Sequence, residues 1–309
     1  MNNFFFLLLL LAACQQTETV KVQEKQTPER WMLFYLGGQS NMDGYGYNKD
    51  LPEDLNQTID DVYIFEGNQV SDNTPDGGLG IWSPLKPGYG ADFRSDGNQN
   101  FYSERFGPEL SFGRRMKALF PGQKIAIIKY ARGGSSIADT ESYGTWTPEF
   151  DEGQGLNQYD AYLTTLRTAF AKSDINEDGR EDVLVPFGIA WMQGESDAVQ
   201  TPAIAMAYEA NLKQLIDLMR ASLREDDLPV AIGKIKDSGM DEDGLLMDHL
   251  AIVHQAQANF CEKDAKATLV KSTENYSFLS DPWHYTSPDY IDLGQQFAEA
   301  LAALIKNGK

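Results

Sequence analysis

A serine, a histidine and an aspartate stand where they could form a nucleophilic site. Ser40 lies in the motif GQSNM (residues 38–42), directly after the apolar run Trp31–Leu36, which predicts a strand. A serine hydroxyl is a weak nucleophile at its own pKa and needs an adjacent base that a third group orients. His284 is one of three histidines, and Asp281 precedes it by three residues on a turn stiffened by proline. This pattern favours acyl transfer.

The other two histidines, His249 and His254, are weaker candidates for the base. They lie five residues apart in the stretch Leu246–Cys261, whose spacing predicts a helix, so they would face different sides of it. Neither has the spacing of a metal ligand pair or follows a predicted strand. We expect both to have structural or surface roles.

A pair of glycines follows another apolar run. Gly133 and Gly134 begin the motif GGSS (residues 133–136) after the run Ile125–Ala131, and glycine lets bare backbone N–H groups approach a ligand. Such donors stabilise the negative oxygen that develops in acyl transfer. Taken alone, a tight turn would explain the same motif.

A third polar segment, WMQGESD (residues 191–197), follows a predicted strand. It offers one amide side chain, Gln193, and two carboxylates on one loop. Alone it could instead cap the next helix through Ser196 or Asp197.

The sequence around Ser40 does not complete the nucleophile-elbow pattern Gly-x-Ser-x-Gly. Gly38 is in the right place, but Met42 stands where the second glycine belongs. This difference disfavours a standard α/β-hydrolase.

Apolar runs alternate with amphipathic stretches along the chain. The runs predict strands at 31–36, 62–65, 125–131, 183–191, 230–235 and 267–270, and the stretches predict helices at 109–120, 159–172, 202–224, 246–261 and 289–306. This alternation favours a mostly parallel sheet covered on both faces. Sites of such sheets lie beyond the carboxyl ends of the strands, where Ser40, Gly133 and Gln193 would converge.

Charge limits the classes of partner. The 309 residues carry a net charge of −20, which argues against nucleic acid or an anionic membrane surface as a partner. The length suits one large α/β domain or two small ones, and no internal repeat or domain linker is evident.

The first residues read as a secretion signal. Residues 1–13 contain an apolar run, Phe4–Leu11, too short to span a bilayer, and end before Cys14 in the order Leu-Ala-Ala-Cys, which resembles a bacterial lipoprotein signal. Cys14 would then be lipidated, although an ordinary cleaved signal with an incidental cysteine is the alternative. Residues 14–30 are polar and read as a flexible tether. Cys261 is the only other cysteine, so no intramolecular disulfide is expected.

The segment Gly67–Phe106 is a long predicted loop rich in glycine, polar residues and aromatic residues. Its aromatic rings would suit the apolar faces of sugar rings. The alternative is a loop packed on its own aromatic side chains.

The acidic segment Asp174–Asp182 matches the first half of a calcium-binding loop. Asp174, Asn176 and Asp178 stand at alternate positions, but Val185 occupies the place of the expected bidentate glutamate. A turn capped by its own side chains is favoured, and a structural calcium ion is the alternative.

Four motifs in order give a specific resemblance. GQSNM (38–42), GGSS (133–136), WMQGESD (191–197) and DPWH (281–284), together with GPEL (107–110), resemble the SGNH hydrolases. The pattern is most similar to the sialate O-acetylesterase-like group, which includes the acetylxylan esterases of carbohydrate esterase family 6. The similarity spans roughly residues 32–305.

The resemblance implies a flavodoxin-like, three-layer α/β/α sandwich with a mostly parallel sheet. It implies Ser40 as nucleophile, His284 as base and Asp281 as the group that orients the base. The oxyanion donors would be the backbone of Ser40, a glycine of the pair 133–134 and a side chain of the third motif. In that motif Gln193 is the expected donor, with Ser196, at the position of the usual Asn, as the alternative. Three neighbours are expected to contact substrate or support the site: Gln39, Asn41 and Glu195.

The sequence therefore predicts a signal at 1–13, a tether at 14–30 and an SGNH esterase domain at 31–309. The expected activity is removal of O-acetyl groups from a carbohydrate, acetylated xylan or sialic acid, with no required cofactor and no metal in the active site. The alternatives are a lipase or thioesterase, and a non-catalytic glycan-binding lipoprotein. The expected location is the bacterial cell envelope, with membrane attachment through lipidated Cys14.

Overall fold

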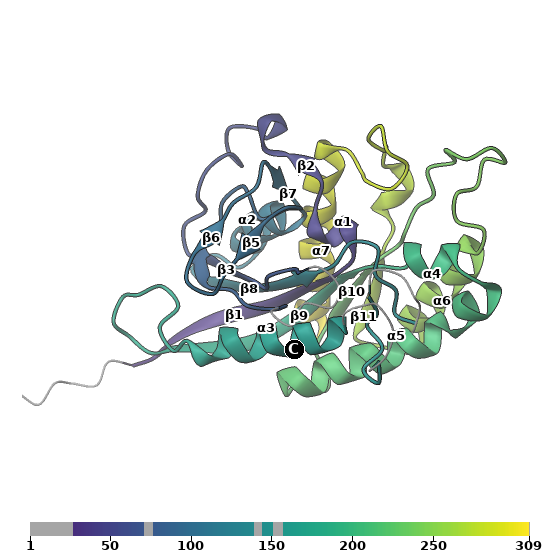
Figure 1. Ribbon diagram of the computed structural model, residues 1–309. Helices are drawn as coiled ribbons and strands as arrows, with labels where there is room; N and C mark the ends of the chain where they lie inside the picture. The colour runs from purple at the N-terminus through teal and green to yellow at the C-terminus, as the bar shows by residue number, and fades with distance from the viewer. Residues whose placement is uncertain (1–26, 71–76, 139–143, 151–156, 309) are drawn as a thin grey trace, which may run out of the picture.

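The computed structural model describes residues 27–70, 77–138, 144–150 and 157–308; the predicted signal, Cys14 and most of the tether lie outside these residues. The described chain forms a seven-stranded sheet with helices on both faces (Figure 1). Its strand order is β11-β10-β9-β1-β8-β3-β4, and only the β3–β4 pair is antiparallel. The bounds are β1 Glu29–Gly38, β3 Val62–Glu66, β4 Trp82–Pro84, β8 Lys124–Ala131, β9 Asp182–Met192, β10 Val230–Gly233 and β11 Ala267–Val270.

The helices form the two outer layers. Phe34 of β1 packs edge to face on Phe112 at 5.4 Å between ring centroids, and the next residue, Tyr35, packs on Tyr162 at 4.8 Å. Successive strand residues point to opposite faces, so these contacts place α2 and α3 on opposite sides of the sheet. The helices are α1 Ser40–Asp43, α2 Glu109–Leu119, α3 Gln158–Ala171, α4 Glu195–Val199, α5 Pro202–Leu223, α6 Leu250–Lys263 and α7 Ser287–Asn307, with 3-10 turns at Asn48–Asp50 and Ser272–Asn275. The predicted three-layer α/β/α fold is confirmed.

Element boundaries differ from the prediction by up to four residues. Strand β1 begins at Glu29, inside the expected tether, because the Glu29 N–H donates to the Glu181 carbonyl and Arg30 pairs with Val183 of β9. Helix α6 begins at Leu250, four residues later than expected. The polarity of residues 29 and 30 predicts a tether, but their pairing with β9 makes them the first residues of β1.

The long segment Gly67–Phe106 is organised by short strands, where described. Besides β4 it contains β5 Arg94–Ser95, β6 Asn100–Phe101 and β7 Arg105–Phe106. Tyr89 is buried and lies 5.0 Å from Phe93 and 5.3 Å from Tyr102 between ring centroids. These contacts favour the loop packed on its own aromatic rings over the sugar-binding alternative.

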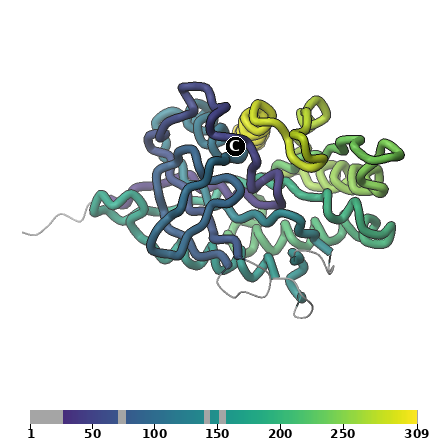
Figure 2. Tube along the Cα trace, turned by 45° about the horizontal axis from the view of Figure 1, so that its top comes forward, coloured from purple at the N-terminus to yellow at the C-terminus, as the bar shows by residue number. Residues whose placement is uncertain are grey.

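A small ribbon joins this segment to the chain that follows Ser40. Strand β2, Gly46–Tyr47, pairs antiparallel with β7, so that Gly46 lies opposite Phe106 and Tyr47 opposite Arg105. Figure 2 shows the C-terminal segment, in yellow, beside this early, purple part of the chain. Segments far apart in sequence thus meet above the sheet.

A buried lysine connects the elements around this region. Lys129 of β8 is fully buried, and its Nζ donates to the backbone carbonyls of Asp43 at 2.8 Å and Tyr89 at 2.5 Å. The same atom lies 3.0 Å from a carboxylate oxygen of Glu109 and 3.3 Å from one of Glu66. Burial alone would lower the pKa of Lys129, but the nearby carboxylates raise it, so the cation stays charged.

Replacing this cation should destabilise the fold. Lys129→Met leaves the buried carboxyl groups of Glu109 and Glu66 without their cationic partner, and breaking a buried ion pair typically costs about 3–5 kcal/mol in the free energy of unfolding. Urea denaturation measures the loss. The matched control is Lys213→Met, which breaks an exposed ion pair with Asp217 and should cost less than about 1 kcal/mol. Equal losses in the two variants would contradict a central role for Lys129.

Candidate functional site

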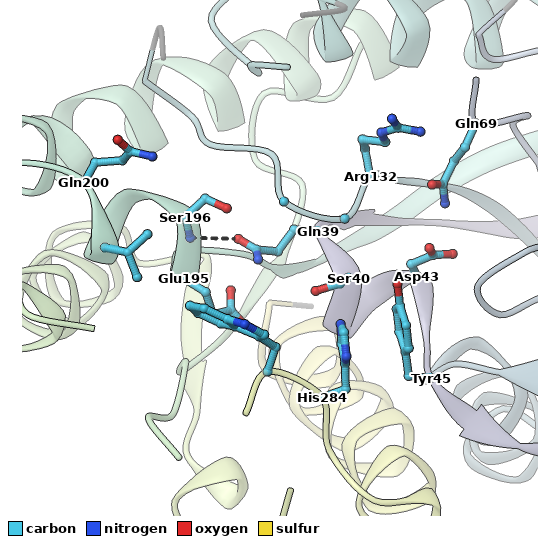
Figure 3. A pocket seen from close by; sticks show the side chains of 14 residues that line it. Gln39, Ser40, Asp43, Tyr45, Gln69, Arg132, Glu195, Ser196, Gln200 and His284 are labelled. Carbon is cyan, nitrogen blue, oxygen red and sulfur yellow. Dashed lines mark hydrogen bonds between the residues drawn. The ribbon is translucent and has the colours of Figure 1, made fainter. Parts of the chain in front are cut away.

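A cavity of about 460 Å³ opens at the carboxyl ends of β1, β8 and β9 (Figure 3). Residues from five separated parts of the chain converge on it, as the alternation of strands and helices predicted for a parallel sheet. The lining residues are Gln39, Ser40, Asp43, Tyr45, Gln69, Arg132, Gly133, Gly134, Glu195, Ser196, Val199, Gln200, Trp283 and His284.

Ser40 lies on a sharp turn between β1 and α1. Gly38 has a φ of 146°, and a Cβ at this position would stand 1.9 Å from the carbonyl oxygen of Met192, so only glycine fits. The Gln39 N–H donates to the same carbonyl at 2.9 Å. The turn therefore brings Ser40, which is 6% exposed, to the cavity wall although Met42 breaks the elbow pattern.

His284 and Asp281 share one turn, as predicted. Oδ1 of Asp281 accepts the backbone N–H groups of Trp283 at 2.9 Å and His284 at 3.0 Å, which closes the turn. The same oxygen lies 2.9 Å from Nδ1 of His284. Nδ1 nevertheless has no well-directed hydrogen bond among the described residues. The carboxylate is thus within hydrogen-bonding distance of Nδ1 but lies to the side of its N–H direction.

The two groups have opposite charge preferences. Burial lowers the pKa of His284 below its usual value, and the attraction of Asp281 opposes this only in part. Burial alone would raise the pKa of Asp281, but hydrogen bonds from backbone N–H groups and the nearby imidazole lower it. At neutral pH the arrangement favours a neutral imidazole beside an ionised carboxylate.

Figure 3 shows the ring of His284 extending toward the Ser40 side chain. It also shows the ring of Tyr45 lying parallel to the imidazole. The two ring centroids are 3.5 Å apart and the planes differ by 5°. The sequence analysis did not single out Tyr45. Its position in the sequence could have identified it: Tyr45 stands five residues after Ser40 and directly after Gly44, whose φ of 104° turns the chain back.

Gly133 and Gly134 also reach the cavity. A Cβ at Gly133 would stand 3.5 Å from the Cβ of Ser40, so the bare backbone faces the serine directly. Gly134 has a φ of 72°, which glycine adopts without strain. Any side chain larger than alanine at Gly133 would cover the serine.

The structure contradicts Gln193 as an oxyanion donor. Its side chain is fully buried, does not line the cavity, and donates through Nε2 to Asp197 at 2.6 Å. The same nitrogen lies 3.2 Å from the Ser135 carbonyl and 3.3 Å from Oε1 of Gln39. The amide protons are thus committed inside the protein, because Asp197, on the helix that follows, turns the side chain inward.

Gln39, unlike Gln193, lines the cavity. Its Oε1 accepts from the backbone N–H groups of Gly194 and Ser196 and from Gln193, each at 3.3 Å. Three donors on the oxygen fix the orientation of the amide, and Nε2 is left as the end that faces away from them. Figure 3 shows this nitrogen turned away from the Ser196 backbone. The sequence predicted for Gln39 only that it contacts substrate or supports the site.

Asn41 links the motifs beneath the cavity. Its Nδ2 donates to Oε1 of Glu195 at 2.8 Å and to the Trp283 carbonyl at 3.1 Å, while its Oδ1 accepts from Tyr290 at 2.7 Å. Asn41 therefore supports the site, whereas Glu195 lines the cavity. Burial raises the pKa of Glu195 to about 7, and an oxygen of its carboxyl group has no hydrogen-bond partner among the described residues.

The remaining predicted candidates lie elsewhere. His249 is the N-cap residue of α6, and Nε2 of His254 lies 2.7 Å from the Ile235 carbonyl, in line with the expected structural roles. Asp174 accepts backbone N–H groups from Asp178 at 3.1 Å and Gly179 at 2.9 Å, as a capped turn would. The described residues contain no group of three or more His, Cys, Asp or Glu side chains that could bind a metal ion together. Calcium binding by this loop, which would also use Asn176, stays a prediction.

None of the helices in the described part of the chain is long and apolar enough to cross a bilayer. Cys261, in α6, is a free and partly buried thiol.

Comparisons with known proteins connect the site to a family. A family model described as "Carbohydrate esterase, sialic acid-specific acetylesterase" matches residues 30–303. No curated protein matches the chain.

Solved structures share the fold. A protein from Arabidopsis thaliana is 20% identical, with a TM-score of 0.61 over 90% of this chain and 100% of its own. A carbohydrate acetylesterase from Xanthomonas citri is 17% identical, with a TM-score of 0.58 over 89% of this chain and 56% of its own. NanS is 16% identical, with a TM-score of 0.58 over 91% of this chain and 99% of its own.

Proposed function

Because the chain belongs to the carbohydrate esterase family of sialic acid-specific acetylesterases and is a carboxylic ester hydrolase, we propose that it removes O-acetyl groups from carbohydrate through Ser40, His284 and Asp281. One observation carries the assignment of residues. Ser40, Gly133 and His284 come from distant segments and line the same cavity. A nucleophile, a base and bare backbone donors are what acyl transfer requires.

The reaction proceeds through an acetyl-enzyme. Oγ of Ser40 attacks the acetyl carbonyl carbon while His284 takes the hydroxyl proton. When the tetrahedral intermediate collapses, His284 returns that proton to the sugar oxygen, and the deacetylated sugar leaves. Water, deprotonated by His284, then attacks the acetyl carbon; His284 returns that proton to the oxygen of Ser40 as the acyl bond breaks, and acetic acid leaves and ionises in solvent.

The electrostatics suit each step. The low pKa of His284 keeps the imidazole neutral and able to accept the serine proton near neutral pH. The ionised Asp281 stabilises the imidazolium that forms during the attack. No metal or organic cofactor is required by this sequence of steps.

Three donors can stabilise the oxyanion. The N–H of Ser40 begins a helix and has no intrahelical acceptor. The Gly133 backbone lies against the serine, and Nε2 of Gln39 takes the place first expected for Gln193. Each such donor typically contributes about 100- to 1000-fold to the rate.

The cavity fits a small polar acyl group and a sugar better than a long acyl chain. Its volume of about 460 Å³ is in the usual range for small-ligand sites. Arg132, Gln69 and Gln200 contribute polar groups to its wall, and the aromatic rings of Tyr45 and Trp283 contribute apolar surface. A lipase or thioesterase would need an extended apolar channel. Acetylated xylan and acetylated sialic acid both remain substrate candidates.

Substitution of the proposed nucleophile tests the function. Ser40→Ala should lower kcat at least about 1000-fold on p-nitrophenyl acetate and on an acetylated glycan, because the variant lacks the attacking oxygen. His284→Ala should be comparably damaging, and Asp281→Asn somewhat milder. The matched control is His254→Ala, which removes a histidine outside the cavity.

Acetate release from acetylated xylan and acetylated sialic acid identifies the sugar. Faster hydrolysis of p-nitrophenyl decanoate than of the acetate would favour the lipase or thioesterase alternative. Glycan binding without any acetate release would favour the non-catalytic alternative. A Ser40→Ala variant with more than a few per cent of wild-type activity would remove Ser40 from the mechanism.

The role of Gln39 has its own test. Gln39→Glu keeps the oxygen that three donors bind but loses the N–H donor, so kcat should fall about 100- to 1000-fold with little change in KM. Gln200→Glu is the matched control, because it places the same charge in the same cavity. If both substitutions lower kcat equally, the effect is one of charge and Gln39 is not an oxyanion donor.

We further propose attachment to the bacterial cell envelope through lipidated Cys14. Cys14→Ser should move the protein from the membrane fraction to the soluble fraction without changing its specific activity, because a polar segment separates Cys14 from the domain. Detergent-phase partitioning and fractionation of both proteins measure this. Unchanged membrane association would point to another mode of attachment. The net charge of −20 gives no support to a nucleic-acid partner.

A further inference from the structure

The imidazole of His284 is held face to face by Tyr45. The ring centroids are 3.5 Å apart and the planes are nearly parallel, at 5° (Figure 3). Asp281 fixes the backbone of the turn and lies beside Nδ1, but Nδ1 has no well-directed hydrogen bond among the described residues. The Tyr45 ring therefore restricts the rotation of the imidazole from one face, while Asp281 lies beside Nδ1.

Arg105 supports the tyrosine ring in turn. The guanidinium carbon of Arg105 lies over the Tyr45 ring, 4.8 Å from its centroid. Since the imidazole occupies one face of that ring at 3.5 Å, the guanidinium lies on the other face. Nη1 of Arg105 also donates to the Tyr45 carbonyl at 3.0 Å, which fixes both the ring and its backbone.

Arg105 is itself held in place by the small ribbon. Tyr47 pairs with Arg105 across β2 and β7, and Nη2 of Arg105 lies 3.3 Å from the Tyr47 hydroxyl. The guanidinium also lies 4.6 Å from the centroid of the Tyr47 ring. The ribbon thus presents one cation to two aromatic rings, a favourable arrangement for a partly desolvated guanidinium.

We propose that Tyr45 and Arg105 are positioning residues for the reaction: the Tyr45 ring holds the plane of the His284 imidazole toward Ser40, and Arg105 holds Tyr45 from behind. The inference rests on the proposed role of His284 as the base. A misplaced catalytic group typically costs about 100-fold in rate, which sets the scale of the expected effect.

Arg105 also acts on the charge of the base. The charged groups that act on the imidazole are Asp281, which raises its pKa, and Arg105, which lowers it together with burial. Asp43 and Glu195 line the same cavity from α1 and α4. A fixed cation behind Tyr45 disfavours a second positive charge on His284, so the base stays available for the serine proton.

Substitutions at Tyr45 separate the ring from the hydroxyl. Tyr45→Leu should lower kcat about 10- to 100-fold on p-nitrophenyl acetate, while Tyr45→Phe should stay within about 5-fold of wild type, because stacking needs the ring only. The matched control is Tyr63→Leu, which removes a tyrosine ring packed on Trp31 at 5.4 Å, outside the cavity. A wild-type kcat in folded Tyr45→Leu, or equal losses in the Phe and Leu variants, would overturn the role of the ring.

Substitution of Arg105 tests the charge. Arg105→Gln should shift the acidic limb of the kcat/KM profile to higher pH, because loss of the cation raises the pKa of His284 and activity requires the neutral imidazole. A limb that stays in place or moves to lower pH would overturn this part of the proposal. A purely structural role of Arg105 would change the stability of the protein but leave the pH of the acidic limb unchanged. Measuring stability and the pH profile of the same variant therefore separates the two roles.

Proton NMR of the unsubstituted protein tests the stack even if Tyr45→Leu does not fold. The chain has three histidines, and His284→Ala identifies the resonances of His284 by their disappearance. Stacking on Tyr45 should shift its ring protons upfield, and unshifted protons would overturn the proposal. The two proposals fail separately: an inactive wild type or an active Ser40→Ala removes the function, whereas an active wild type with an unshifted His284 removes only the stack.

Discussion

The buried charge of Lys129 is the constraint on which the surroundings of the site depend. A cation in the interior must be surrounded by acceptors, and here two backbone carbonyls and two carboxylates come from different elements. One of those carbonyls belongs to Asp43, the last residue of the helix that begins with Ser40. The lysine therefore connects the sheet, the start of α2 and the long loop to the segment that carries the proposed nucleophile.

Polar contacts around Ser40 complete this arrangement. Gln39 accepts three hydrogen bonds from the third motif, and Asn41 donates to Glu195 and to the Trp283 carbonyl beside His284. The residues on either side of the serine thus bind the two other segments that form the cavity. Because these hydrogen bonds are buried, they specify one arrangement of the loops, in which Ser40 and His284 line the same cavity.

Much of the fold followed from local patterns. Apolar runs predicted the positions of the six parallel strands, and turns after three of them predicted which edge of the sheet would carry the site. The patterns missed β4, because Trp82–Pro84 is a short segment inside a polar loop whose strand character comes only from pairing with β3. Glu29 and Arg30 were assigned to the tether for the same reason: their pairing with the chain near Val183 is not visible in their own polarity.

The sequence by itself determined which residues could supply the chemistry, because Ser40, Asp281, His284 and the glycines at 133–134 stand in motifs whose types and order are specific. Only the tertiary structure decided which amide faces the cavity. Gln193 and Gln39 have the same functional group, but the carboxylate of Asp197 binds the first inside the protein and three N–H donors orient the second. It also decided that Tyr45 and Arg105 stack behind His284, since ring packing across segments 60 and more residues apart leaves no local signal in any one of them.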